Sequence, residues 1–362
     1  MNGRRAGAGL TQGAALRERD TQRRSHEHEH SSPPAALLVK PTRAAARGPA
    51  PRPAATVPPV VARASLLGGA EGRTVVSDDG VRIFYEVLGA TSPSAPVLVL
   101  ANGLGGRLYA WEPLIERFAR THRILTWDYR GLFRSGTPAR TKQLAVVHHA
   151  ADAVRVLDRE GVARATFVGW SMGVQVALEA ALEHPGRVRR LVLLNGSYGH
   201  IFETGLQPLV RLPLFHRTMH AAVERLVRSP SFVAALGRLL RNDWHVEGVG
   251  RVLALVWGNP RLVDMYRQYL EDVFGESFEN YLRLFQALDA HSVYHLLPEV
   301  RQPTLVISGL LDWLTPARMS FEIARRIPDA QHLHLTRGSH FAVLEQTPRV
   351  VERIARFLEA TA

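Results

Sequence analysis

The sequence predicts an α/β protein in which a mostly parallel sheet is covered by helices on both faces and carries a helical insert. Apolar runs of strand length alternate with segments of helical periodicity from about residue 72 to the C-terminus. A Gly-x-Ser-x-Gly motif at residues 169–173 stands where a strand-like run passes into a helix-like one, and residues 197–298 are helical in pattern only. Strands that alternate with helices form parallel sheets, and such sheets carry their sites at the carboxyl ends of strands.

Residues 1–70 precede this alternation and differ from it in composition. They are rich in Ala, Arg and Pro, lack hydrophobic periodicity, and contain the alternating tract His26-Glu27-His28-Glu29-His30. Such a segment cannot bury enough apolar surface to offset the entropy lost on ordering, so we expect a disordered N-terminal tail. The tract could hold a metal weakly, but a flexible polar tail is the favoured reading. Two Arg-Arg pairs resemble a twin-arginine signal, yet no apolar segment follows either of them.

The first part of the predicted core covers residues 71–196. It begins with a β-hairpin, in which strands 73–76 and 81–87 flank an Asp-Gly turn. Further strands are expected at 96–101, 123–127, 165–168 and 188–194, and helices at 108–120, 143–160 and 171–184. The strands are continuous apolar runs and the helices show a 3.6-residue apolar period, which together indicate a sheet buried on both faces.

Residues 197–298 interrupt the alternation with a helical pattern and scattered aromatic residues. We interpret this segment as a helical cap, or lid, over the site. A second independent domain is the alternative, but the sheet pattern continues on both sides of the segment. Strands are expected again at 303–308 and 332–335, and helices at 317–326 and 349–360, so residues 299–362 complete the core.

Ser171 is the candidate nucleophile. It is the central residue of the motif at 169–173, which we call the nucleophile elbow. A serine on a tight strand-to-helix turn needs small residues two positions before and after it, and Gly169 and Gly173 supply them. The hydroxyl would then project above the sheet at a helix N-terminus. A purely structural turn serine is the less favoured alternative.

A serine hydroxyl is a weak nucleophile without a base and a group that orients the base. Asp312 follows the predicted strand 303–308, and His340 follows the predicted strand 332–335. The carboxyl ends of parallel strands share one edge of the sheet, so Ser171, Asp312 and His340 are expected to converge there. Their roles would be attack, orientation of the imidazole, and proton transfer. A loop-capping aspartate is the alternative for Asp312.

Acyl transfer also needs backbone N–H donors for the developing oxyanion. Met172, the residue after the nucleophile, supplies one at the helix N-terminus. We expect the second from Leu104 in the loop at residues 102–106, Asn-Gly-Leu-Gly-Gly, which we call the oxyanion loop. Its three glycines allow a close approach of the main chain to a ligand, although they would also suit a simple turn. Residues expected to line the substrate pocket are Gly103, Trp170, Trp313 and Phe341.

From about residue 73 onwards the chain resembles the α/β-hydrolase-fold family. The matching segments are the nucleophile elbow, the oxyanion loop, Asp128-Tyr129-Arg130-Gly131, Gly309 to Asp312, and Gly338-Ser339-His340. The resemblance implies serine-dependent, carboxylesterase-like hydrolysis, because the aspartate nucleophile of haloalkane dehalogenases and epoxide hydrolases is absent. Three departures are Asn102 where His is usual, Leu132-Phe133 where Gly is frequent, and Val174 where a second Gly is frequent. We interpret residues 128–130 as an ion-paired structural loop.

Composition excludes several other classes of function. The chain has no cysteine, which rules out disulfides, thiolate metal sites and a cysteine nucleophile. Of the formal net charge of +12, residues 1–70 carry +7, and no basic patch with interleaved aromatics points to nucleic acid. No apolar stretch reaches the length of a membrane span. We therefore expect no metal, no cofactor, a cytoplasmic location and a small-molecule ester as substrate.

The expected activity is hydrolysis of a carboxylic ester, or a related acyl bond, through an acyl-enzyme on Ser171. The same three residues could instead serve cofactor-free perhydrolysis, lactone opening or carbon–carbon bond hydrolysis. A catalytically inactive binding protein on the same scaffold is the alternative from a different class. Fold alone does not decide among these.

Overall fold

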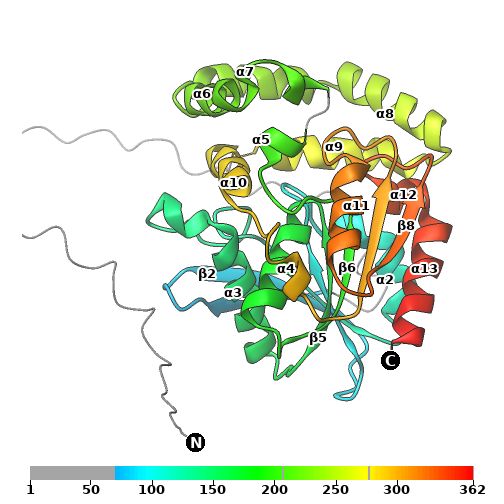
Figure 1. Ribbon diagram of the computed structural model, residues 1–362. Coiled ribbons are helices and arrows are strands. Elements are labelled where there is room, and N and C mark those ends of the chain that lie inside the picture. Colours follow the sequence, from blue (N-terminus) through cyan, green and yellow to red (C-terminus); the bar gives the residue numbers. More distant parts are fainter. Residues whose placement is uncertain (1–69, 206–207, 276–277, 362) are drawn as a thin grey trace, which may run out of the picture. The chain divides into compact units, whose positions relative to one another are not determined.

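The computed structural model describes residues 70–205, 208–275 and 278–361, so the predictions for the N-terminal tail and its histidine tract lie outside the described residues. In this part of the chain one sheet has eight strands in the order β1-β2-β4-β3-β5-β6-β7-β8 (Figure 1). The strands are β1 (Glu71–Val76), β2 (Arg82–Gly89), β3 (Val97–Ala101), β4 (Arg123–Trp127), β5 (Ala165–Trp170), β6 (Val188–Leu194), β7 (Thr304–Gly309) and β8 (Gln331–Leu335). The pairs β1–β2 and β2–β4 are antiparallel and all other pairs are parallel, which confirms the predicted sheet.

The antiparallel edge begins with the predicted hairpin. Ser77 N–H donates to Val81 O at 2.8 Å, and Gly80 N–H donates to Ser77 O at 2.9 Å. Gly80 has a φ of 84°, a conformation that a residue without Cβ adopts at no steric cost. The Asp-Gly turn therefore connects β1 to β2 as the sequence predicts.

Helices cover both faces of the sheet, and alternate residues of a strand enter different cores. On β3, Val99 packs into a core with residues of α3 and α4, whereas Leu98 and Leu100 pack into a second core with α2 and α13. The core helices are η2 (Leu108–Trp111), α2 (Glu112–Phe118), η3 (Thr141–Leu144), α3 (Val146–Arg159), α4 (Met172–Glu183), α11 (Ala317–Arg326), α12 (Ala342–Glu345) and α13 (Thr347–Ala360). The helices predicted at 108–120 and 143–160 each begin as a separate 3₁₀ turn. In the first, Pro113 lies in the first turn of α2, where its missing N–H costs no helical hydrogen bond.

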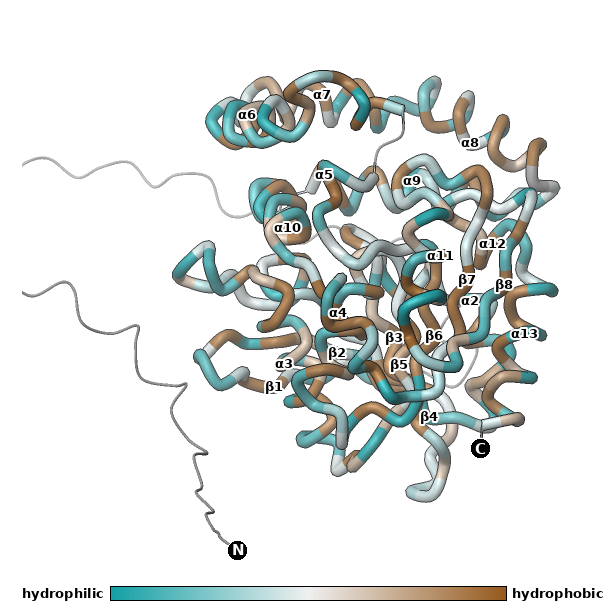
Figure 2. Tube along the Cα trace, viewed as in Figure 1, coloured by the Kyte–Doolittle hydropathy of each residue, from teal (hydrophilic) through white to brown (hydrophobic). Residues whose placement is uncertain are grey.

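The central strands β5 and β7 and the helix α4, which follows the elbow, are deeply buried. All residues of β5 and β7 are buried, and the hydropathy colouring shows apolar tube where the strands lie between the helices (Figure 2). The sequence predicts one apolar stripe on α4, but the structure buries most of its surface, including Gln175. The reason is that α4 contacts three strands and also α3, so it has little face left for solvent.

Between β6 and β7 the described residues form helices and loops. We call residues 197–298 the helical insert. Its elements are α5 (Ile201–Thr204), η4 (Leu209–Arg211), α6 (Phe215–Val227), α7 (Pro230–Leu240), α8 (Asp243–Trp257), α9 (Arg261–Val273), α10 (Phe278–Ala290) and η5 (Leu297–Glu299). The two ends of the insert lie side by side, because Gly199 bridges to Ser292 and Val293 N–H donates to Tyr198 O at 2.9 Å. None of the described helices is long and apolar enough to span a bilayer.

Candidate active site at the carboxyl ends of the strands

Ser171 lies between β5 and α4 in a conformation that only a very tight turn requires. Its φ of 56° and ψ of −114° are unusual for a residue with a side chain, and such a conformation costs about 1–3 kcal/mol. A Cβ on Gly169 would overlap the carbonyl of Gly173, and a Cβ on Gly173 would overlap the carbonyl of Ala101. Both glycines are therefore required by the close approach of the backbone, as the motif spacing predicts.

Asp312 and His340 meet at the same edge of the sheet. The distance from His340 Nδ1 to Asp312 Oδ2 is 2.9 Å, and both side chains are buried. Asp312 Oδ1 also accepts backbone hydrogen bonds from Leu314 at 3.0 Å and Thr315 at 2.9 Å. Burial alone would raise the pKa of Asp312, but the adjacent His340 and these hydrogen bonds hold it below its ordinary value. The carboxylate is therefore kept ionised and fixed against the imidazole.

Two residues that the sequence analysis did not identify hold Asp312 in place. Asn195, directly after β6, has a φ of 45°, and its Nδ2 donates to Asp312 Oδ2 at 2.9 Å and to Ser339 O at 3.0 Å. Thr315 Oγ1 donates to the same Asp312 oxygen at 2.8 Å. The one available signal was the position of Asn195 at the carboxyl end of a predicted strand.

Trp170 connects Ser171 to His340. Its Nε1 donates to the His340 carbonyl oxygen at 2.8 Å, and the two ring centroids are 5.6 Å apart. Among the described residues, no hydrogen bond joins Ser171 Oγ to His340 itself. In enzymes without bound substrate this bond is often long and shortens when the complex forms. The structure thus brings Asp312 and His340 into contact and attaches the elbow to the histidine loop through the indole.

The oxyanion loop packs on the same indole. A Cβ on Gly103 or Gly106 would lie 2.7 Å from the Trp170 ring, so both positions need glycine. The Asn102 side chain, which stands where histidine is usual, donates to Trp127 O at 2.9 Å and accepts from Trp111 Nε1 at 2.7 Å. These bonds fasten the start of the loop to β4 and to η2.

The two backbone groups expected to face an oxyanion lie at the elbow and in the oxyanion loop. Met172 is the first residue of α4, where N–H groups have no partner within the helix. Leu104 is buried in the oxyanion loop. Within the described part of the chain, neither the Leu104 N–H nor the Met172 N–H donates to another protein group.

Helix α9 of the insert reaches the oxyanion loop. Tyr269 Oη donates to Leu104 O at 3.3 Å and lies 3.2 Å from Tyr281 Oη. Three residues further along α9, Asp272 lies 3.6 Å from Arg107. Burial raises the pKa of Asp272 to about 6, although Arg107 opposes the shift. The insert therefore contributes aromatic and acidic side chains next to the loop.

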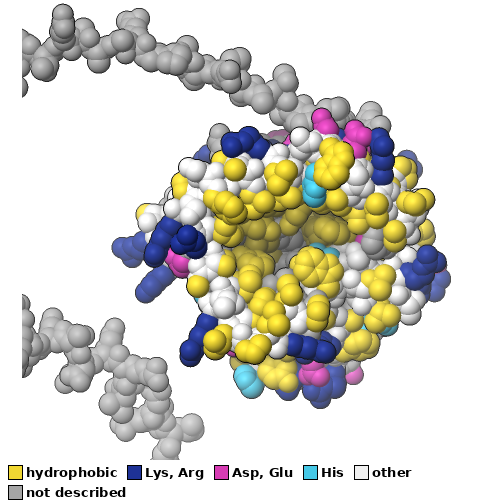
Figure 3. All heavy atoms as spheres, turned by 90° about the horizontal axis from the view of Figure 1, so that it is seen from above, with side chains coloured by type: hydrophobic (Ala, Val, Ile, Leu, Met, Phe, Trp, Pro, Cys, Tyr) yellow, Lys and Arg dark blue, Asp and Glu magenta, His cyan; other side chains and the backbone are white. Residues whose placement is uncertain are grey.

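The four residues expected to line a pocket differ in position. Trp170 and Gly103 are buried against one another, and the ring of Phe341 lies 5.5 Å from Trp170 and 6.3 Å from Tyr269. Trp313 is 55% exposed. Seen from above, the molecule has a hollow surrounded by hydrophobic side chains (Figure 3). Such a concave apolar surface suits a small organic ligand.

The loop at residues 128–130 is ion-paired, as expected, and the partners of Arg130 are far from it in the sequence. Arg130 is buried and forms ion pairs of 2.6 Å with both Asp152 and Asp79. Asp128 instead contacts Arg134 at 3.0 Å. Arg130 therefore joins the end of β4 to α3 and to the hairpin turn, which is a structural role.

Comparisons with known proteins agree with this architecture. A family model described as alpha/beta hydrolase fold matches residues 96–347. A protein of Stutzerimonas stutzeri (strain A1501) named as a carbamate hydrolase, RutD, is 30% identical over 257 residues, which cover 71% of this chain and 89% of that protein.

Two solved structures share the fold at low sequence identity. The esterase EaEST from Exiguobacterium antarcticum has a TM-score of 0.62 at 19% identity, covering 80% of this chain and 100% of that chain. The enol-lactonase from Burkholderia xenovorans LB400 has a TM-score of 0.59 at 23% identity, covering 79% and 100%.

Proposed function

Because the chain belongs to the alpha/beta hydrolase fold family, we propose that it is a serine hydrolase that cleaves a carboxylic ester or a related acyl bond. The observation that carries this proposal is the 2.9 Å contact between His340 and the ionised Asp312, at the sheet edge where the elbow presents Ser171. A nucleophile, a base and an orienting carboxylate in this order are the parts that acyl transfer needs. No cofactor enters the proposed reaction.

In the proposed mechanism Ser171 Oγ attacks the carbonyl carbon of the substrate while His340 Nε2 takes the hydroxyl proton. Asp312 holds the Nδ1–H and stabilises the imidazolium that forms. The oxyanion receives hydrogen bonds from the Leu104 and Met172 N–H groups. The alcohol leaves with the proton from His340. Water then gives a proton to His340 Nε2 and attacks the acyl carbonyl carbon. The bond from that carbon to Ser171 Oγ breaks, His340 returns the proton to Ser171 Oγ, and the acid leaves.

The helical insert serves as a cap in this proposal, while residues 71–196 and 299–362 form the catalytic core. The hydrogen bond from Tyr269 of α9 to Leu104 O supports this assignment, because it joins the insert to the oxyanion loop. Of the pocket residues, Phe341 has the best support, since its ring centroid lies 5.5 Å from that of Trp170 and 6.3 Å from that of Tyr269. In this proposal Gly103, Trp170 and Trp313 also contact the substrate, and they select it by the shape of the pocket more than by polar contacts.

Esters, lactones and carbamates all form a tetrahedral intermediate on serine, so the same residues can serve all three. The relative named as a carbamate hydrolase makes a carbamate a useful member of a substrate panel. We expect hydrolysis of short and medium-chain esters, with lactones and carbamates as the comparison arms. An absolute need for peroxide or a diketone would instead favour perhydrolysis or carbon–carbon bond hydrolysis.

A fluorophosphonate probe tests the proposal directly, because it labels only a serine that a base activates. Wild-type protein should be labelled, Ser171→Ala should not, and Ser320→Ala, which alters a buried serine of α11, should label normally. We expect ester hydrolysis by Ser171→Ala to fall about 10⁴-fold or more, because triad members act as a unit. Absence of labelling in folded wild-type protein would favour a binding protein.

A further inference from the structure

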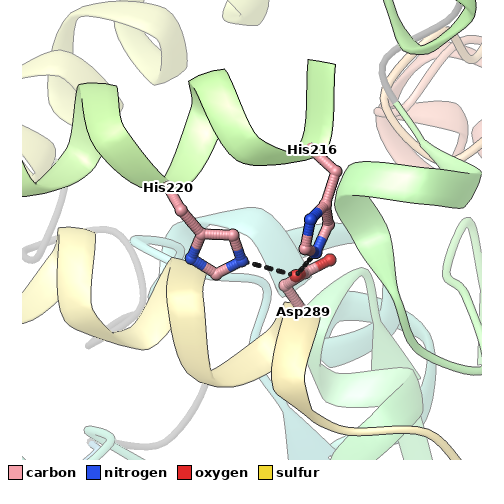
Figure 4. A group of neighbouring side chains, drawn as sticks. All are labelled: His216, His220 and Asp289. Carbon is pink, nitrogen blue, oxygen red and sulfur yellow. Dashed lines mark hydrogen bonds and ion pairs between the residues drawn. The ribbon is translucent and has the colours of Figure 1, made fainter. Parts of the chain in front are cut away.

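Two histidines and an aspartate meet in the helical insert, on helices that carry none of the proposed catalytic residues. His216 and His220 are four residues apart on α6, a spacing that places both side chains on one face of the helix. Asp289 lies in the last turn of α10. Its Oδ2 is 3.0 Å from His216 Nε2 and 2.9 Å from His220 Nε2 (Figure 4). The three possible ligand atoms all lie within 4.8 Å of one another.

Asp289 is held rigidly and has little other charge compensation. Its side chain is buried, with 4% exposed. Its Oδ1 accepts the backbone N–H of Phe202 at 2.8 Å, and its backbone carbonyl lies 3.1 Å from His200 Nδ1. Within the described residues no lysine or arginine pairs with Asp289, so the two imidazoles alone face its charge. Buried carboxylates are normally paired with a cation or bound to a metal.

We propose that His216, His220 and Asp289 bind a divalent transition-metal ion of the zinc class. Imidazole nitrogen and carboxylate oxygen are the ligands that Zn²⁺ prefers where cysteine is absent. Three protein ligands leave a fourth position for water.

The two separations that involve Asp289 Oδ2 are near those of such a centre. Bond lengths of about 2.0–2.1 Å place tetrahedral ligand atoms roughly 3.3 Å apart, close to the 2.9 and 3.0 Å that separate Asp289 Oδ2 from the two nitrogens. The histidine side chains are 44% and 36% exposed, so their rings have room to turn and an ion has a route in.

The bound ion would have a structural role, holding parts of the insert together. It joins α6 to the end of α10, and Phe202, whose N–H binds Asp289, lies in α5 just after β6. The Phe202 ring also lies 5.0 Å from the His220 ring. A bound ion would therefore hold α6 against the segment through which the insert leaves the sheet. Sequence spacing does not reveal this site, because 69 residues separate His220 from Asp289. The expectation of no metal came from composition, which lacks cysteine, and did not consider this cluster.

Zinc titration of the full-length chain tests the proposal, provided that the histidines of the N-terminal tract are removed as competitors. The background protein carries His26→Gln, His28→Gln and His30→Gln. We expect it to bind one zinc per chain in calorimetry, with at least about tenfold weaker binding after His216→Gln or Asp289→Asn. The matched control is His245→Gln, which alters another histidine of the insert and should bind zinc as the background does.

Two further readouts locate the ion. Cobalt should give the strong visible absorption of a tetrahedral centre in the background protein and lose it in His216→Gln. Zinc at a hundred times its dissociation constant should raise the melting temperature by about 5 °C in the background protein and in His245→Gln, but not in His216→Gln. Zinc binding that is absent in the background, or unchanged by both ligand substitutions, would overturn the proposal. Should Asp289→Asn fail to fold, the half-exposed His216 variant decides alone.

Discussion

The indole nitrogen of Trp170 donates a 2.8 Å hydrogen bond to the carbonyl oxygen of His340, so the residue before Ser171 is bonded to the residue proposed as its base. The same ring packs against Gly103 of the oxyanion loop. One buried side chain thus connects the nucleophile elbow, the loop that carries His340 and the oxyanion loop. The relative positions of these three segments must be kept during acyl transfer. Small errors in such geometry are expensive for catalysis.

Trp170→Phe should therefore lower kcat while the protein stays folded. The phenyl ring keeps part of the packing but has no N–H for His340, and loss of one buried hydrogen bond corresponds to roughly a tenfold change. Steady-state kinetics with an ester, beside circular dichroism, would measure this. The matched control is Trp244→Phe, since Trp244 of α8 is 84% exposed and should tolerate the change. Equal effects from both substitutions would contradict a positioning role for Trp170.

Asn195→Ala should lower kcat about 10- to 100-fold with little change in KM, because a hydrogen bond to a charged group is worth about 1.5–3 kcal/mol. Without the Nδ2 donor, Asp312 loses one of the bonds that orient it toward His340. Asn195→Asp should be worse, since it places a second carboxylate against Asp312. The pH–rate profile is the discriminating measurement, and an unaltered profile in both variants would assign Asn195 to folding alone.

Asp272→Asn should stabilise the protein at pH 8 and not at pH 4. The pKa of Asp272 is raised from 3.8 to about 6 in the folded state. A raised pKa means that the protonated form favours folding, and that this contribution is lost as the pH rises from about 4 through 6. The asparagine removes the cost of burying the charge, about 1–3 kcal/mol.

Denaturant unfolding at the two pH values would measure the difference. Asp243→Asn, which alters an exposed aspartate of the same insert, is the control and should show no gain at pH 8. A similar gain for Asp272→Asn at both pH values would mean that charge burial is not the cause.

Tyr269→Phe should change substrate choice more than the reactivity of Ser171. The substitution keeps the ring near Phe341 but removes the hydroxyl that donates to Leu104 O. We expect an altered KM or acyl-chain preference across a series of esters, with labelling by the fluorophosphonate probe retained. Tyr266→Phe, which alters another tyrosine of α9, serves as the comparison. If Tyr269→Phe abolished labelling in a folded protein, the insert would be part of the catalytic machinery.

Local sequence patterns were sufficient to predict those site residues whose positions are set by the end of a strand or by the spacing within a turn. The contact between Asp312 and His340 could be predicted because both follow strands whose carboxyl ends must share one edge. Gly169 and Gly173 could be predicted because their spacing reflects the turn itself. Asn195 could not, since its contact with Asp312 depends on a φ of 45° and on a partner 117 residues away. For the same reason, the partners of Arg130 were not apparent.

The bridge between Gly199 and Ser292 means that the insert leaves the sheet and returns to it at one point. Strands β6 and β7 are also neighbours in parallel pairing, so their register is set without the insert. The contact between residues 199 and 292 therefore does not depend on the helices between them. The entropic cost of closing the chain there rises only slowly with the length of the insert. This junction is consequently a natural graft point, where a different set of helices could be exchanged onto an unchanged sheet edge.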